Sequence, residues 1–386
     1  MTKVSEQEVE TGLTHDEYAI RWQWAECKDF TPTPEQVERG LTDSCNSVRK
    51  AWARRTDFTP TPEQVFRGIT DEDWNVRMTW AERIDYTPTP EQLEVGLTDI
   101  CWWIRRDWSL RDDYAPTSKQ VERGLTDESA EVRAAWAVKV GYTPTPEQVE
   151  RGLSDDNAFV RSSWAQRIDF IPTPEQSERG LTDCDAEVRL LWARREDFTP
   201  TPEQIERGLT DQEEKIRRAW IQRTDFTITP EQAERALNDA NHDIRWYAII
   251  RTDFIPTPQQ VERGLVDDNL LIRRAWSYRM DFTPTPEQVE RALTDDYAAV
   301  RMAWARRTDF TPTAEQIERG LTDAQQEVRE AWALRMDFTP EMYQVERGLQ
   351  DGDTKVREAW VRRWSIMRDA MSEVSCGDFN SLGFSV

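Results

Sequence analysis

Apolar and polar positions along this chain recur with a single period of 28 residues. Tryptophan occupies the same position of the period in twelve copies, and Ala248 takes its place in the remaining copy. The twelve residues are Trp24, Trp52, Trp80, Trp108, Trp136, Trp164, Trp192, Trp220, Trp276, Trp304, Trp332 and Trp360. A register held without insertion is typical of a solenoid, in which each unit packs only against its neighbours. The pattern therefore predicts thirteen repeats of one unit.

The copy at residues 31–58 shows where the first helix of a repeat should begin. Thr33 is a candidate N-cap, Pro34 stands at the first helical position, and Gln36 follows the cap by three residues. This is the spacing of a capping box, and proline is favoured at the first position of a helix. A small residue precedes Leu41 and its equivalents; it is Gly in eleven of thirteen copies and Ala in two. We expect close helix packing at that position.

A second helix is predicted in the other half of the repeat. Asp43 is the expected cap, Val48 and Trp52 recur at helical spacing, and Arg54 and Arg55 lie in the last turn. Arginine is favourable there because the carboxyl end of a helix carries partial negative charge. Prolines of the next copy should prevent the helix from continuing. The residues expected to form the core are those equivalent to Val37, Leu41, Val48, Ala51, Trp52 and Phe58.

The string Leu-Thr-Asp-x4-Val-Arg-x2-Trp or Ala, in which Asp43 precedes Arg49 by six residues, resembles the second half of HEAT-type helical repeats. The Thr-Pro-Glu-Gln opening of the short unit is similar to the leucine-rich-repeat variant branch of that group. The resemblance implies that Asp43, Arg49 and their equivalents are structural and form ladders of hydrogen bonds between successive units. We expect an all-α, right-handed α-solenoid (superhelix) of thirteen 28-residue, two-helix repeats.

Two departures from that group affect the expected structure. The unit is short, so its first helix has room for only about two turns of ~3.6 residues and is expected to be partly 3₁₀. Tryptophan also stands where such repeats usually place a smaller aliphatic residue. The resemblance covers about residues 9–364, and it does not identify a partner.

The 28-residue register also predicts the domain organisation. We assign residues 1–8 to an N-terminal cap segment, residues 9–364 to a single repeat domain, and residues 365–386 to a C-terminal cap or tail. No run of 18 apolar residues suggests a membrane span, and no signal-peptide core is evident. The five cysteines form neither pairs nor metal-ligand spacing. A cytoplasmic protein without membrane contact is expected.

Catalytic chemistry is not favoured by this composition. Only two histidines, His15 and His242, are present. A Ser-His-Asp set or a histidine metal cage is therefore not expected. Most carboxylates recur at fixed register, whereas a catalytic residue should be an exception to the repeat. We predict a non-enzymatic protein that needs no cofactor and no metal.

The net charge of -23 raises the alternative of an acidic inhibitor that imitates DNA, such as a phage counter-defence factor. Thirteen units at roughly 9 Å spacing give about one net charge per 5 Å, whereas duplex DNA carries one per about 1.7 Å. Of the 50 basic residues 43 are Arg, which suits bidentate pairing with carboxylates of a neighbouring unit. The acids that a mimic would present are Asp155, Asp156, Asp267, Asp268, Asp295 and Asp296. Head-to-tail assembly of arrays is a third possibility.

The positions that vary between copies carry the prediction about function. Positions equivalent to Ser47, Lys50 and Arg54 share one face of the second helix, and several copies place aromatic or aliphatic residues there. Drift at unconstrained positions would also produce variation, but protein interfaces are enriched in aromatic residues and Arg. We predict that this face lies on the concave side and binds a protein partner, with direct nucleic-acid binding not expected. The predicted contacts are Trp74, Trp102, Trp103, Arg106, Phe159, Trp246, Leu271, Arg274 and Tyr278.

Overall fold

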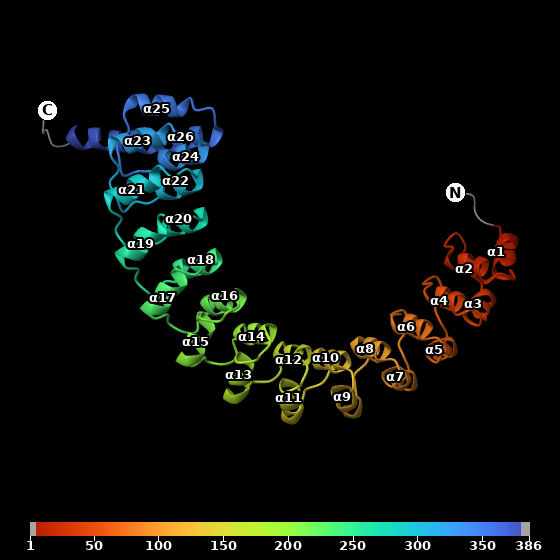
Figure 1. Cartoon of the computed structure of the whole chain (residues 1–386). Helices are drawn as coiled ribbons and strands as arrows, with labels where there is room; N and C mark the ends of the chain where they lie inside the picture. Colours follow the sequence, from red (N-terminus) through yellow and green to blue (C-terminus); the bar gives the residue numbers. More distant parts are fainter. Residues whose placement is uncertain (1–4, 380–386) are drawn as a thin grey trace. The chain divides into compact units, whose positions relative to one another are not determined.

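The computed structural model describes the backbone of residues 5–379 and the side chains of residues 5–368. Within these residues all regular structure is helical, and 26 helices form thirteen successive pairs (Figure 1). The chain divides into two compact units, residues 1–199 and residues 200–386, which are described separately. The expected all-α solenoid of two-helix repeats is confirmed. The assignment of residues 9–364 to a single domain stays a prediction.

Unit 1 contains seven helix pairs. Their bounds are α1 (Glu6–Leu13), α2 (Tyr18–Glu26), α3 (Pro34–Leu41), α4 (Asn46–Ala53), α5 (Pro62–Ile69), α6 (Trp74–Ala81), α7 (Pro90–Leu97), α8 (Trp102–Leu110), α9 (Ser118–Leu125), α10 (Ala130–Val138), α11 (Pro146–Leu153), α12 (Ala158–Ala165), α13 (Pro174–Leu181) and α14 (Ala186–Ala193). Residues 5–8, which the sequence assigned to a cap segment, include the start of α1. Residues 1–4 lie outside the described residues.

Unit 2 contains six helix pairs. Their bounds are α15 (Pro202–Leu209), α16 (Glu214–Gln222), α17 (Pro230–Leu237), α18 (His242–Ile250), α19 (Pro258–Gly264), α20 (Leu270–Trp276), α21 (Pro286–Leu293), α22 (Ala298–Ala305), α23 (Ala314–Leu321), α24 (Gln326–Ala333), α25 (Met342–Leu349) and α26 (Thr354–Phe379). Helix α26 continues past the last repeat, so residues 365–379 of the predicted cap or tail are helical. Residues 380–386 lie outside the described residues.

Each unit consists of two layers of helices. Odd-numbered first helices pack beside one another in one layer, and even-numbered second helices pack beside one another in the other. Within each unit taken by itself, the second helices lie on the inner side of the bend of the row (Figure 1). The expectation that the second helices occupy the concave side therefore holds for each unit.

The start of the first helix agrees with the sequence prediction. The Thr33 hydroxyl accepts a hydrogen bond from the Gln36 backbone N–H at 3.3 Å, and Gln36 Oε1 accepts one from the Thr33 N–H at 3.0 Å. Helix α3 is α-helical over all eight of its residues. The expected 3₁₀ character is therefore wrong here, because the reciprocal cap and the N1 proline satisfy the α-helical geometry of a two-turn helix.

The expected cap of the second helix is also wrong. The N-cap residue of α4 is Cys45 rather than Asp43, and its backbone N–H donates to Asp43 Oδ1 at 2.8 Å. The Asp43 carboxylate instead receives the guanidinium of Arg21 from the preceding repeat. Asp43 thus accepts a hydrogen bond within the turn before α4 and also forms an ion pair with Arg21 of the preceding repeat.

The tryptophan series forms the core of the repeats. Trp52 is buried, and a methyl group on Gly40 would lie 2.2 Å from the Trp52 Nε1 atom, so glycine leaves room for the indole. This confirms close packing at the glycine. In the copy with Ala248, Ala236 stands in place of the glycine, and both alanines are buried.

Candidate functional site

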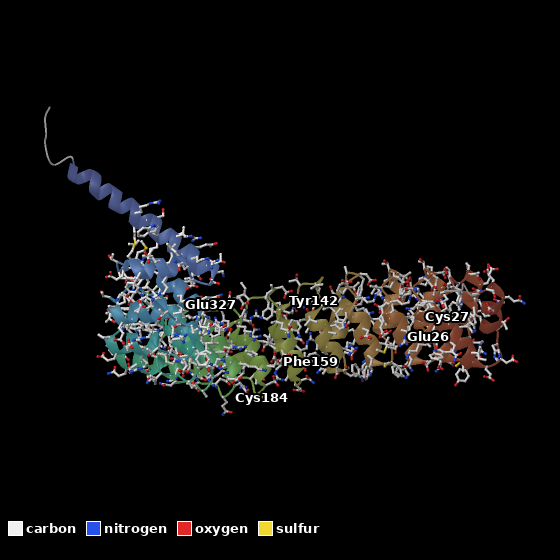
Figure 2. The ribbon with its side chains drawn as sticks, turned by 90° about the horizontal axis from the view of Figure 1, so that it is seen from above. Glu26, Cys27, Tyr142, Phe159, Cys184 and Glu327 are labelled. Carbon is white, nitrogen blue, oxygen red and sulfur yellow. The ribbon has the colours of Figure 1, made fainter. Side chains whose placement is uncertain are left out.

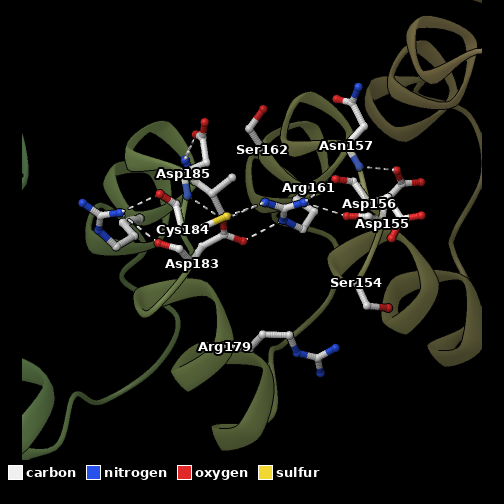
Figure 3. Close-up of polar contacts among 12 residues, drawn as sticks. Ser154, Asp155, Asp156, Asn157, Arg161, Ser162, Arg179, Asp183, Cys184 and Asp185 are labelled. Carbon is white, nitrogen blue, oxygen red and sulfur yellow. Dashed lines mark hydrogen bonds and ion pairs between the residues drawn. The ribbon is translucent and has the colours of Figure 1, made fainter.

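One ladder of ion pairs connects successive second helices. Arg161 donates from Nη1 to the backbone oxygens of Asp155 and Asp156, at 2.7 and 3.1 Å (Figure 3). It also pairs with the Asp183 carboxylate of the next repeat. The ladder role implied by the HEAT-type resemblance is therefore observed. The carboxylate partners of Arg161 and Arg133 lie 22 residues ahead, rather than six residues behind in the same repeat.

The electrostatics of this ladder favour the charged forms. Burial opposes ionisation of Asp183, but hydrogen bonds from Arg161 and from the Asp185 backbone N–H outweigh it and hold the pKa of Asp183 below 3.8. The hydrogen bonds that Arg161 donates to Asp183 likewise raise the pKa of Arg161, although burial opposes this. The pair stays ionised at neutral pH.

A second ladder was missed by the sequence reasoning. The Arg83 guanidinium, which is buried, donates from Nη1 to the backbone oxygens of Ala53 and Arg55, both at 2.7 Å. It also pairs with Asp85 at 2.5 Å and lies 4.9 Å from the centre of the Phe58 ring. The sequence placed this arginine at the end of its own helix. The structure shows that it satisfies carbonyl groups at the end of the preceding repeat's second helix.

A third, more exposed ladder connects the first helices. Arg151 pairs with Glu122 of the preceding repeat at 2.6 Å, and Gln148 donates to the same carboxylate. One link departs from the rule, because Phe66 replaces the glutamate and Val95 replaces the arginine of the next repeat. Pairs of this exposure contribute at most about 1 kcal/mol each. Most of the charged side chains that recur from repeat to repeat therefore interact with a neighbouring repeat.

The acids assigned to a DNA mimic fall into two groups. Asp155, Asp267 and Asp295 are ladder residues, paired with the arginine of the preceding repeat. The residues that follow them, Asp156, Asp268 and Asp296, are exposed.

In unit 1 the predicted contact residues cluster on the first turns of α6 and α8. Trp74 and Trp102 are the first residues of these helices, and Trp74 and Trp103 are exposed. The Trp102 and Trp103 rings stack with their centres 4.6 Å apart. The Arg106 guanidinium lies 5.9 Å from the centre of the Trp102 ring and pairs with Asp107 at 2.8 Å. Together they form an aromatic and cationic surface.

Phe159 lies further along the same layer, on α12, and its side chain is 60% exposed. It lies towards one long edge of the unit 1 ribbon, and Tyr142 lies towards the opposite edge (Figure 2). The variable face is not exposed throughout, because Ala134, Ser162 and Leu190 at its middle position are buried. Neighbouring second helices cover that position in these repeats.

In unit 2 the predicted contacts belong to α18 and α20. Trp246 is exposed, and its ring meets that of Tyr247 edge to face with 4.9 Å between centres. Tyr247 and Ile250 line an open hollow of about 520 Å³. Sequence reasoning did not select Tyr247 or Ile250 as contacts. The signal was available, because both belong to the copy that lacks the core tryptophan.

The other unit 2 contacts lie on the next second helix. Leu271 lies in the first turn of α20, Tyr278 lies in the turn just after this helix, and both are exposed. Arg274 Nε donates to the Tyr278 hydroxyl at 2.9 Å, so these two side chains form one polar-aromatic feature. The nine predicted residues thus divide between the two units: Trp74, Trp102, Trp103, Arg106 and Phe159 belong to unit 1, and Trp246, Leu271, Arg274 and Tyr278 belong to unit 2.

Neither a metal centre nor a membrane span is found in the described part of the chain. Among the described side chains of residues 5–368, no group of three or more His, Cys, Asp or Glu residues is arranged to hold a metal ion. The helices described there lack the combination of length and apolar composition that crossing a bilayer requires.

One family model and several solved structures are similar to parts of this chain. The family model of the HEAT repeat associated with sister chromatid cohesion matches residues 118–135, which include α9 and the first turns of α10. A leucine-rich repeat variant with a novel repetitive structural motif is 22% identical, covers 62% of this chain and 88% of its own, and gives a TM-score of 0.44. None of the curated proteins matches this chain.

Two further solved structures are similar over most of this chain. An engineered protein is 12% identical, covers 93% of this chain and 98% of its own, and gives a TM-score of 0.28. Importin beta is 11% identical, covers 92% of this chain and 47% of its own, and gives a TM-score of 0.25. The paired helices and the unbroken register show an all-helical repeat array, and residues 118–135 of this array are similar to a HEAT repeat.

Proposed function

We propose that this protein is a non-enzymatic scaffold that binds a protein partner through the exposed residues of its second helices. The observation that carries the proposal is the exposed aromatic cluster of unit 1, where Trp103 stacks on Trp102 beside Arg106. In other repeats the position of Trp103 is occupied by residues such as Ser47 or Glu187. The core does not require an aromatic residue there.

Physical chemistry supports a protein partner for this surface. Trp, Tyr and Arg are the residues that most often dominate the binding energy of protein interfaces. Their large, rigid side chains bury much area with little loss of conformational entropy. The Trp102 and Trp103 rings are already stacked, and Arg106 is held by Asp107, so part of the ordering cost is met before binding.

The alternative function, imitation of DNA by acidic residues, has less support from the same structure. The ladder acids, such as Asp155, are engaged by arginines of a neighbouring repeat and are not free to replace DNA phosphates. A DNA mimic would depend on the exposed set formed by Asp156, Asp268 and Asp296. We therefore place protein binding through the aromatic surface first and mimicry second.

The proposal is tested by affinity capture followed by mass spectrometry, at low and high salt. The wild-type chain is compared with a variant that carries both Trp103→Ala and Phe159→Ala. A partner retained by the wild type at both salt concentrations, and lost by the variant, is the expected result. Equal retention by both proteins would show that the aromatic surface of unit 1 does not carry the binding.

A further inference from the structure

The second ladder is broken at one internal repeat of unit 1. In the neighbouring repeats a buried arginine pairs with an aspartate two residues later, as in Arg111 with Asp113 and Arg167 with Asp169. At the intervening repeat Lys139 and Gly141 replace both members of the pair. The surface therefore lacks a carboxylate at a position where the adjacent repeats have one.

The charge that remains at this repeat is directed inward. Lys139 is 6% exposed, and its ammonium group donates to the Arg111 backbone oxygen at 2.6 Å. The ammonium nitrogen also lies 4.1 Å from the centre of the Tyr114 ring. Burial lowers the pKa of Lys139, although Asp113 opposes the shift. The amine thus donates a hydrogen bond to the backbone of the preceding repeat and is buried away from solvent.

A hollow is lined by residues of the same loop. Gly141 has φ of 93°, and a methyl group placed there would have only Pro116 Cδ within 4 Å, at 3.5 Å. The hollow has a volume of about 390 Å³, and its apolar lining includes Val138, Val140 and Ile168. Val140 is 73% exposed and Ile168 is 92% exposed. Isolated exposed aliphatic residues are ordinary, but this group surrounds a concave site.

The electrostatic surroundings of the hollow are acidic. Unit 1 contains 39 Asp and Glu against 25 Lys and Arg, a net charge of -14. In unit 1 the six other loops of this type carry aspartate at the position of Gly141; they read Lys28–Asp29, Thr56–Asp57, Ile84–Asp85, Asp112–Asp113, Ile168–Asp169 and Glu196–Asp197. The apolar hollow therefore interrupts a row of carboxylates along one edge.

We infer that this hollow binds one apolar side chain of a protein segment that carries basic residues on both sides. The Val138, Val140 and Ile168 side chains bury the apolar group. Asp113 and Asp169 in the loops before and after it pair with buried arginines but remain 28% and 41% exposed, so their carboxylates and the net negative charge of unit 1 attract the flanking cations. The site lies near Tyr142, towards the edge of the ribbon opposite Phe159 (Figure 2). It is independent of the surface proposed above for the partner.

The test uses methyl NMR of the full chain with a synthetic probe peptide. The probe is a single leucine between glycines, with two lysines at each end. Two matched peptides replace the leucine by serine or the lysines by glutamates. The matched protein carries Lys139→Arg and Gly141→Asp, which restore the residues of the neighbouring repeats, where the aspartate has a negative φ. Its melting temperature is measured first, because the loop must leave the φ of 93° that Gly141 adopts. Ile84, exposed beside Asp85 in another loop, provides the control methyl group.

The expected result is a saturable shift of the Val138, Val140 and Ile168 methyl signals with the lysine-flanked leucine probe. Apparent affinity should fall about ten-fold or more with the serine peptide, because burial of a leucine is lost. It should fall similarly in the double variant, while Ile84 stays unshifted. Absence of a shift, an equal shift in the double variant, or equal binding of the glutamate-flanked peptide would each overturn the inference.

Discussion

Arg161 donates from Nε and Nη2 to the two carboxylate oxygens of Asp183, both at 2.7 Å, and so connects α12 to the turn before α14. Both side chains are largely buried, with 12% and 7% of their surfaces exposed. The pair joins residues 22 positions apart, in successive repeats. Loss of one partner leaves the other charge buried without compensation, which is more costly than loss of an exposed pair.

We first predict that Arg161→Ala lowers the free energy of unfolding by about 3 to 5 kcal/mol. The matched control is Arg151→Ala, which removes the half-exposed pair with Glu122 and should cost less than about 1 kcal/mol. Urea denaturation of both variants gives the comparison. Equal losses would show that burial does not distinguish the two ladders.

The second prediction concerns the pH dependence of stability. Burial opposes ionisation of Asp155 and Asp183, but hydrogen bonds from arginine outweigh it and lower the pKa of each below 3.8. Their stabilising contribution is complete above the unfolded pKa of about 3.9 and is lost as pH falls through the folded pKa. The melting temperature should therefore vary little with these groups between pH 7 and 5 and fall below about pH 4. An Asp183→Asn variant should show a smaller acid-induced decrease.

The third prediction tests the tryptophan core. Trp192 is 1% exposed, and Trp192→Ala should lower the free energy of unfolding by about 3 to 5 kcal/mol. Because solenoid repeats interact mainly with their neighbours, the damage should be local and should separate unfolding into two transitions. Calorimetry with limited proteolysis measures both effects. A loss below about 1 kcal/mol would contradict a core role for Trp192.

The fourth prediction separates binding from folding on the aromatic surface. Trp103→Ala with Phe159→Ala should weaken partner binding by about 2 kcal/mol or more. The melting temperature should change little, because both side chains are exposed. Glu187→Ala, at the equivalent position of α14, is the control and should leave affinity unchanged. A large fall in melting temperature without loss of affinity would assign these aromatics to stability.

The fifth prediction distinguishes a protein scaffold from a DNA mimic. If the aromatic surface carries binding, Asp156→Asn, Asp268→Asn and Asp296→Asn together should change the affinity little. The affinity should then depend only modestly on salt. Titration of the captured partner from low to high salt, with DNA as competitor, provides the measurement. A steep salt dependence, displacement by DNA and loss of binding in the triple variant would instead support mimicry.

Some features that depend on neighbouring residues in the sequence were predictable. The capping box of Thr33 and Gln36 follows from a three-residue spacing, and the structure contains both of its hydrogen bonds. The burial of Trp52 follows from a strict period together with apolar neighbours at helical spacing. The exposure of Trp103 was also predictable. Its position varies between repeats and lies on the helix face away from the position equivalent to Trp52.

The sequence alone determined the unit, its two helices and the residues that point into the core, because a 28-residue period repeated thirteen times leaves little freedom in local structure. Only the tertiary structure decided which copies interact. Asp43 and Arg49 are six residues apart, yet Asp43 pairs with Arg21 and Arg49 pairs with Asp71. The same stacking directs Arg55 to carbonyl groups of the preceding repeat. The reason is geometric. The translation and rotation from one repeat to the next decide which side chains face each other, and the spacing of residues within a repeat does not specify this translation and rotation.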